Sequence, residues 1–236
     1  MYKYLTGINP IDAKGGVNPG TNILVLAPAF SHGEEVASYL AMPRPKEYMI
    51  VLSTESQSED LLDFFVNNNF STECIGIIDA ISRTSLSAIE DTQKIKYVGS
   101  PSDLTGMDIK FSQLTEEIMK GEFHEDPDQL FPTPIRYCIL SLTSMLMFRK
   151  IDTIYQFLHV ITSKLRKMGS IGVFLLNNES FDQKTLSIAK QLMNVVVEIK
   201  NDDGGKMIRL QGAMGLSMPW KPFEFEDGKL IISPGE

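Results

Sequence analysis

The sequence predicts an α/β fold built around a mostly parallel β-sheet. Short apolar runs rich in β-branched residues alternate with longer amphipathic stretches, which is the pattern of strand–helix–strand units. Several short runs are apolar on both faces, as strands are when helices cover both faces of their sheet. The chain has 236 residues, 43% of them apolar, and nothing in the pattern marks a second core. We therefore expect a single domain over residues 1–236.

Eight apolar segments are expected to form strands. In chain order they are Asn22–Ala27, Tyr48–Ser53, Cys74–Asp79, Lys96–Gly99, Tyr137–Leu142, Ile171–Leu176, Val195–Lys200 and Met207–Leu210. Five amphipathic segments between them are expected to form helices flanking the sheet. These are Gly33–Ala41, Gln57–Asn68, Asp108–Met119, Ile151–Lys167 and Gln183–Met193.

Signals for the ends of helices support several of these assignments. Capping-box spacing precedes three of the helices, at Ser31 with Glu34, Ser56 with Glu59, and Ser180 with Gln183. Gly169 is placed to end the fourth helix, since glycine readily adopts the left-handed conformation found there.

The last two predicted strands flank the sequence Asn-Asp-Asp-Gly-Gly, which is typical of a tight turn. We therefore expect a C-terminal antiparallel β-hairpin at one edge of the sheet. Residues Gly121–Pro134 contain three prolines and no usable periodicity, so we expect an exposed loop between a helix and a strand.

Composition argues against several classes of protein. The chain carries 22 basic and 30 acidic residues, and its formal charge of −8 disfavours binding to nucleic acid or anionic membranes. No apolar run approaches the roughly 18–20 residues that cross a bilayer, and the N-terminus lacks the apolar core of a signal peptide. We expect a cytoplasmic protein. Cys74 and Cys138 lie in apolar segments without metal-ligand spacing and are expected to be reduced core residues.

The first strand–loop–helix unit lies where an α/β protein can bind phosphate. A phosphate-binding loop presents glycine-rich backbone N–H groups, a lysine that holds the phosphate charge, and a hydroxyl that binds Mg²⁺. Here the strand Asn22–Ala27 runs into the loop Pro-Ala-Phe-Ser-His and the helix Gly33–Ala41, which begins Gly-Glu-Glu. The lysine and the glycine-rich turn are missing.

The segment TGINPIDAKGGVNPGTNILVLAPAFSHGEE, which starts at Thr6, nevertheless resembles the opening of KaiC-like members of the RecA superfamily of P-loop ATPases. Further matches follow in the family's order over roughly 200 residues. They are Ser53–Ser56, Ile77–Arg83, Tyr97–Ile118, which is similar to an inserted region of the KaiC-like branch, and Arg136–Leu146, which is similar to the Walker B strand. The resemblance implies a RecA-like fold with a C-terminal hairpin, and ring or filament assembly among relatives.

The phosphate-loop positions depart from the family pattern. Its GxxxxGK[ST] motif falls on Ala27–Glu34, so Gly33 stands at the lysine and Glu34 at the Mg²⁺-binding hydroxyl. If the alignment is shifted by one residue, Glu34 stands at the lysine and Glu35 at the Mg²⁺-binding hydroxyl. Reversing one charge pair at about 4 Å changes the interaction from roughly −4 to +4 kcal/mol at an effective dielectric constant near 20. Ser31, His32, Gly33 and Glu34 are thus degenerate phosphate-loop positions.

The Walker B strand is altered as well. Leu140 stands where the family has an aspartate ahead of the serine that Ser141 matches, and leucine cannot hold a metal-bound water. Glu55 matches the acidic residue that, in this family, polarises the attacking water. We interpret Glu55 as a relic or an interface residue, and predict no catalytic residue and no metal site.

Capping-box spacing also leads to a hypothesis about the vacated site. It would let Glu34 fold back on the helix N-terminus that otherwise cradles a phosphate, so that the protein supplies its own anion. This hypothesis predicts a site that is closed internally. His32 is expected to be a loop histidine without a catalytic role.

Other polar and apolar groups receive structural interpretations. His124, Glu125, Asp126 and Asp128 are expected to be a solvated acidic loop, and His159 a structural residue of its helix. Lys164, Arg166 and Lys167 complement a helix dipole. Ser144–Lys150 is the best candidate for a partner contact, while Leu216–Phe225 suits terminal packing or a subunit contact.

Three functions remain open. The first is a non-catalytic KaiC-like pseudo-ATPase that acts in regulation or assembly through a protein partner or self-association and needs no cofactor. The second is an ATPase that binds ATP and Mg²⁺ through backbone amides. The third, a DNA recombination accessory protein, is opposed by the acidic charge. In each case the carboxyl ends of the strands should bring together one set of polar residues. These are Ser31, His32, Glu34, Glu55, Ser141, Ser144, Asn177 and Asn178.

Overall fold

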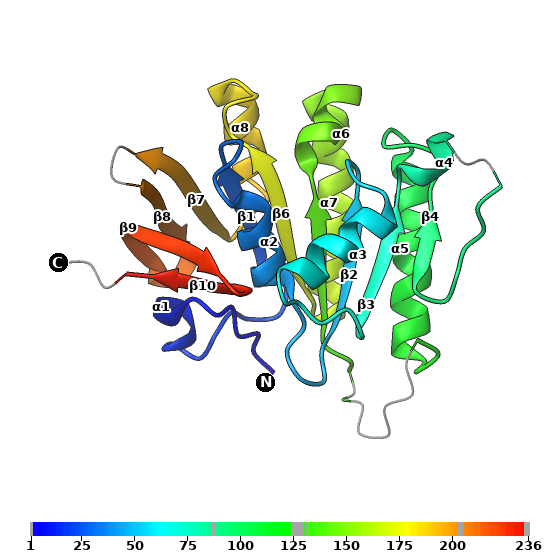
Figure 1. Cartoon of the computed structure of the whole chain (residues 1–236), viewed down its shortest axis with the longest axis horizontal. Helices are drawn as coiled ribbons and strands as arrows, with labels where there is room; N and C mark the ends of the chain where they lie inside the picture. Colours follow the sequence, from blue (N-terminus) through cyan, green and yellow to red (C-terminus); the bar gives the residue numbers. More distant parts are fainter. Residues whose placement is uncertain (1, 86–87, 124–129, 131, 203–204, 234–236) are drawn as a thin grey trace.

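The computed structural model describes residues 2–85, 88–123, 130, 132–202 and 205–233 (Figure 1). Its strands are β1 (Asn22–Ala27), β2 (Tyr48–Ser53), β3 (Ile75–Asp79), β4 (Ile95–Tyr97), β5 (Ile135–Leu140), β6 (Ile171–Asn177), β7 (Val195–Asp202), β8 (Gly205–Gly212), β9 (Ser217–Glu226) and β10 (Lys229–Ile232). Its α-helices are α1 (Asn9–Asp12), α2 (Gly33–Ala41), α3 (Ser58–Asn67), α4 (Ser82–Ser85), α5 (Leu104–Met119), α6 (Leu142–Phe148), α7 (Ile151–Met168) and α8 (Gln183–Lys190), and a 3₁₀ turn covers Ala213–Gly215.

All ten strands join in one sheet, in the order β10-β9-β8-β7-β1-β6-β5-β2-β3-β4. Seven consecutive strands of this order, β7-β1-β6-β5-β2-β3-β4, run parallel to one another, so β1 lies between β7 and β6. Strands β8, β9 and β10 continue the sheet in antiparallel pairs. The predicted α/β fold with a mostly parallel sheet and a C-terminal antiparallel hairpin is therefore confirmed, and the hairpin is the first part of a longer antiparallel edge.

Strands β9 and β10 were not predicted, because prolines disguise the longer of them. Pro219 and Pro222 lie within β9, and proline usually argues against a strand because it cannot donate to the ladder. The pairing of β8 with β9 shifts register between Ile208 and Leu210, and Pro222 lies opposite Met207 beyond that irregularity. Pairing with a preformed neighbour outweighs the weak local preference of this segment.

Helices cover both faces of the sheet, which explains why its central strands are buried along their whole length (Figure 1). On one face, Val25 packs in a cluster with Val36 of α2 and Phe65 of α3. On the other face, Leu24 packs in a cluster with Leu165 of α7, together with residues of α5, α6 and α8. Burial on both faces is the main source of stability for such a sheet. Among the residues that the structure describes, no helix has the length and apolar character needed to cross a membrane.

Helix starts differ from the predicted capping boxes. Those at Ser56 with Glu59 and at Ser180 with Gln183 do not form. The N–H of Ser58 at the start of α3 instead donates to Asp79 at 2.7 Å, because that carboxylate lies at the end of a neighbouring strand. Asp182 caps α8 by accepting from the N–H of Thr185 at 2.8 Å. Gly169 ends α7 with a φ of 70°, as predicted.

Candidate functional site

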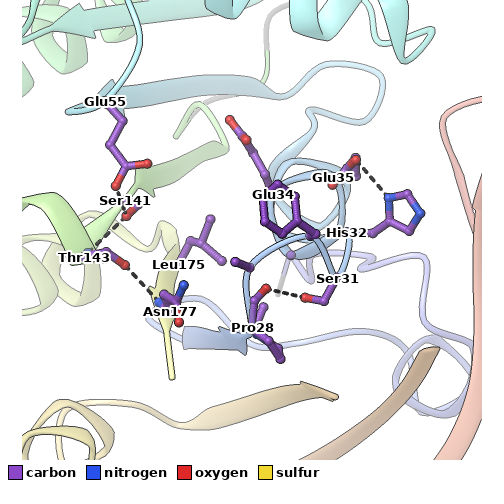
Figure 2. Close-up of a pocket in the computed structure, with 14 residues that line it drawn as sticks. Pro28, Ser31, His32, Glu34, Glu35, Glu55, Ser141, Thr143, Leu175 and Asn177 are labelled. Atoms are coloured by element: carbon purple, nitrogen blue, oxygen red, sulfur yellow. Dashed lines mark hydrogen bonds and ion pairs between the residues drawn. The ribbon is translucent and has the colours of Figure 1, made fainter. Parts of the chain in front are cut away.

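A pocket of about 630 Å³ lies at the carboxyl ends of β1, β2, β5 and β6 (Figure 2). Parallel strands that end at one edge of a sheet bring their following loops together there, as expected from the order of strands and helices. Six of the eight expected residues line the pocket: Ser31, His32, Glu34, Glu55, Ser141 and Asn177. Ser144 and Asn178 lie outside its lining. The Ser144 hydroxyl donates to Thr54 at 2.7 Å, and the Asn178 N–H donates to the Ala27 carbonyl at 3.3 Å.

The degenerate phosphate loop forms one wall of this pocket. Phe30 and His32 both have left-handed backbone conformations, with φ of 59° and 64°. Such values are uncommon for residues other than glycine, so the tight turn that glycines make in a phosphate loop is made here by larger residues. The Ser31 hydroxyl, which is buried, donates to the Pro28 carbonyl at 2.7 Å.

The hypothesis that Glu34 closes the vacated site is wrong. No side chain caps α2, since the Ser31 hydroxyl is turned toward the Pro28 carbonyl. The left-handed conformation of His32 also directs the chain differently from a capping box, whose first residue is extended. Glu34 lines the pocket, which stays open.

Gly33 shows why a lysine at its position would not fit this loop. A Cβ atom added to Gly33 would lie 2.4 Å from the Cβ of Ala27, at the end of β1. Both atoms belong to rigid parts of the chain, so any larger residue requires the loop or the helix to move. The absence of the family's lysine in this register is thus built into the packing of α2 against β1.

Three carboxylates line the pocket. Glu35 lies 2.9 Å from the Nδ1 atom of His32, and Glu55 accepts from the Ser141 hydroxyl at 2.8 Å. Glu34 has no hydrogen-bond or ion-pair partner among the described residues. Its burial, followed by the nearby charges of Glu35 and Glu55, raises the pKa of the Glu34 carboxyl above its ordinary value. Within the described part of the chain, no lysine or arginine lines the pocket, which is therefore acidic.

The opposite wall consists of residues that follow β5 and β6. Leu140 is buried and packs into the apolar core. Ser141, joined to it by a cis peptide bond, caps α6 by accepting from the Thr143 N–H at 3.0 Å and also donates to Glu55. The Thr143 hydroxyl accepts from the N–H of Asn177 at 2.9 Å. Thr143 was missed by sequence reasoning, because only the tertiary structure places it beside β6.

These residues do not fit the magnesium nucleotide that the fold family implies. Among the described residues, no lysine or arginine lines the pocket to hold phosphates, and Glu34 stands at the position of the Mg²⁺-binding hydroxyl, or of the lysine when the alignment shifts by one residue. The side chain of Leu140 offers no oxygen to a metal-bound water. Among the residues described, no group of three or more histidine, cysteine or acidic side chains could hold a metal ion. What remains from a phosphate loop is the N-terminus of α2, which lacks a side-chain cap.

Large apolar side chains are exposed next to this pocket and on the adjoining helix. Phe30, in the pocket wall, is 97% exposed. Met147 and Phe148, at the end of α6, are 65% and 61% exposed, while Met145 of the same helix is buried. The predicted partner segment Ser144–Lys150 thus contains both core and exposed residues. Neighbouring large apolar side chains that are both exposed, such as Met147 and Phe148, are a feature of interaction surfaces.

The remaining predicted residues lie away from the pocket. His124, Glu125, Asp126 and Asp128 fall outside the described residues. His159 is exposed, with its ring 6.5 Å from that of Tyr155.

Lys164 donates to Asp108 of α5 at 2.5 Å, so it does more than complement the dipole of α7. Trp220 of β9 lies 5.1 Å from the Lys200 ammonium and 4.7 Å from the Arg209 guanidinium.

Comparisons with known proteins agree with this architecture. The family described as "Family of unknown function (DUF7504)" matches residues 20–199. No curated protein matches the chain. Among solved structures, the KaiC-like protein PH0186 from Pyrococcus horikoshii has a TM-score of 0.68 and 15% identity, covering 99% of both chains. The uncharacterized protein PH0321 from the same organism, solved in complex with an unknown peptide, has a TM-score of 0.68 and 13% identity, covering 98% of this chain and 99% of that one. The predicted KaiC-like RecA fold is confirmed.

Proposed function

Because the chain belongs to DUF7504, a family of unknown function, and has a KaiC-like RecA fold, we propose that it is a non-catalytic member of this fold class. In this proposal it is a pseudo-ATPase that acts in regulation or assembly through protein contacts. The observation that carries the proposal is the acidic lining of the pocket at the phosphate-loop position. Each carboxylate there meets a phosphate with repulsion, where a lysine would meet it with attraction.

Electrostatic energies also argue that this pocket does not bind a nucleotide. One carboxylate about 4 Å from a phosphate charge raises the energy by roughly 4 kcal/mol at an effective dielectric constant near 20. A micromolar dissociation constant corresponds to only about 8 kcal/mol of binding free energy. Glu34 and Glu35 alone, at the first turn of α2, therefore suffice to remove ordinary affinity for a triphosphate. Hydrogen bonds from the N-terminal backbone of α2 are too weak to offset two such charges.

Protein contacts are the activity that the surroundings of the pocket favour. The exposed Phe30 lies in its wall, and α6, which begins at the pocket, ends in the exposed Met147 and Phe148. A partner segment with a lysine or arginine beside an apolar side chain would complement both the carboxylates and Phe30. The similar structure of PH0321 was solved with a peptide, which is in keeping with peptide binding on this fold.

Calorimetric titration with Mg·ATP tests the loss of nucleotide binding. We expect no saturable heat and no shift of the thermal midpoint at millimolar nucleotide, whereas a ligand at 100 times its dissociation constant stabilises by about 2.7 kcal/mol. A triple variant with glutamine at Glu34, Glu35 and Glu55 removes the pocket charge at nearly constant volume. The matched control is Glu224→Gln, an exposed carboxylate of β9. The proposal is contradicted if the wild-type protein binds Mg·ATP saturably and the triple variant changes that binding, while Glu224→Gln leaves it unchanged.

Partner contact is tested with surface variants. Proteins that co-purify with the wild-type chain should be lost with Phe30→Ser and kept with Val66→Ser, which changes an apolar side chain of α3 that is also exposed. Equal loss with both variants would show that general surface hydrophobicity, and not this region, retains them.

One observation favours a second candidate function, an ATPase of unusual design. The N-terminus of α2 has no side-chain cap, so its first N–H groups are available to a phosphate. Glu55, held by Ser141, would then be the group that orients water. Mg²⁺-dependent ATP turnover that Glu55→Gln abolishes would favour this candidate over the first.

A further inference from the structure

A second cavity, of about 330 Å³, lies at the start of β1, at the opposite end of that strand from the acidic pocket. Its walls come from distant parts of the chain. Lys3 and Lys14 precede β1, Thr21 leads into it, Arg166 belongs to the last turn of α7, and Asn194 precedes β7. Its volume falls in the range of small-molecule sites.

The charge of this cavity is opposite to that of the protein as a whole. Lys3, Lys14 and Arg166 line it, and no acidic side chain of the described residues does. None of these three cations forms an ion pair within the described part of the chain. The whole protein has a formal charge of −8. Three unpaired cations around one small cavity concentrate positive potential, which attracts an anion.

The local backbone holds the cations around the cavity. Gly20 has a φ of 82°, and a Cβ atom there would lie 3.1 Å from the Cγ of Arg166, so the glycine lets the arginine stem lie over this segment. The Lys14 ammonium donates to the Gly215 carbonyl at 2.9 Å, which ties it to the antiparallel edge. An ammonium group has three donors, so further donors remain for a ligand.

Buried polar groups lie next to the same cavity. The Asn194 side-chain carbonyl accepts from the Asn22 N–H at 2.8 Å, so it is oriented by β1. Asn22 follows Thr21 in the chain but does not itself line the cavity; it is fully buried, and neither polar atom of its side chain has a hydrogen-bond partner among the described residues. A buried amide without partners is rare and is usually satisfied by a water or a ligand.

We propose that this cavity binds an oxyanion of a small molecule, either a carboxylate or a phosphate group. Arg166 and Lys14 supply charge-assisted hydrogen bonds, Lys3 adds to the positive potential, and Thr21 and Asn194 provide polar contacts at the wall. The proposal does not rest on the loss of nucleotide binding at the other pocket. If a nucleotide binds to the protein through its phosphates here, binding will depend on Arg166 and not on Glu34.

Calorimetric titrations of the full chain with inorganic phosphate and with citrate test this site. We expect saturable binding of at least one of them, and the stronger probe distinguishes a phosphate site from a carboxylate site. Arg166→Gln and Lys14→Gln should each weaken binding at least tenfold, while Lys167→Gln should leave it unchanged. Lys167 is the matched control because it is exposed on the same turn of α7 and does not line the cavity.

Thermal unfolding without ligand checks that each variant folds. Because three cations take part, affinity should also fall as salt concentration rises. The proposal is overturned if neither probe gives saturable binding, if Arg166→Gln and Lys14→Gln bind as the wild-type chain does, or if Lys167→Gln weakens binding as much as they do.

Discussion

Replacing Arg136 by methionine is expected to destabilise the protein strongly. The Arg136 side chain lies at the start of β5 and is 0% exposed, and its partner Glu47 is 1% exposed. The guanidinium forms a bidentate pair with the Glu47 carboxylate, through Nε and through Nη2. It also donates to the carbonyls of Leu40 at 3.0 Å and Leu5 at 2.8 Å. One side chain thus joins the N-terminal segment, the end of α2 and the start of two strands.

The expected loss of stability follows from the buried polar groups that Arg136→Met leaves without a partner. Methionine fills much of the space but abandons a buried carboxylate and two buried carbonyls, and breaking a buried ion pair from one side costs about 3–5 kcal/mol. For a chain of this size, 1 kcal/mol lowers the thermal midpoint by about 2–4 °C, so Arg136→Met should lower it by about 6–20 °C. Adding Glu47→Leu removes the abandoned charge. The double variant should therefore be less destabilised than the sum of the single variants.

Urea unfolding followed by circular dichroism measures the four corners of this cycle. Lys167→Met, which removes an exposed cation from α7, is the control and should change the unfolding free energy by less than about 0.5 kcal/mol. The reasoning is refuted if Arg136→Met loses less than about 1 kcal/mol, or if the effects of the two substitutions simply add.

Three further predictions concern the first turn of α2 and the end of β3. Because the pKa of Glu34 is raised in the fold, ionisation opposes folding above that pKa, so Glu34→Gln should raise the thermal midpoint at neutral pH and lose this gain below the ordinary value of 4.5. Burial alone would raise the pKa of Asp79, but its four hydrogen bonds outweigh this and hold the pKa below 3.8. Asp79→Asn should therefore lose about 1–3 kcal/mol at neutral pH, and its stability should fall less steeply in acid than that of the wild-type protein. Gly33→Ala should lose about 1–3 kcal/mol in urea unfolding because its Cβ meets Ala27, and unchanged stability would show that the loop yields easily.

Local patterns in the sequence were enough to predict the parallel part of the sheet. The runs that form β1 and β2 are buried at every position and almost entirely apolar, and this is a direct consequence of burial on both faces. The identity of the loop residues was equally informative. Neither register provides the lysine, since Gly33 stands at its position in one and Glu34 in the other, whatever the exact conformation of the loop. Convergence at the carboxyl ends of the strands followed from topology, and it correctly brought Glu55 and Ser141 together.

Contacts between distant segments decided what the sequence did not show. Asp79 caps α3 from a neighbouring strand, so the capping box predicted at Ser56 was misleading. Strand β9 forms despite its prolines because β8 offers a partner. Hydrogen bonds and strand pairing of this kind depend on positions in space, which spacing along the chain does not encode.

The two cavities show the same division. Residue types alone predicted an acidic site at the phosphate-loop position, but only the backbone conformation of His32 and the turned hydroxyl of Ser31 decided that the site is open. Arg166 could be interpreted from the sequence only as the end of a helix. The basic cavity exists because folding brings it beside Lys3 and Lys14, more than 150 residues away along the chain but adjacent at the start of β1. Charge is a property of residues, whereas the field at a site depends on which residues the tertiary structure places together.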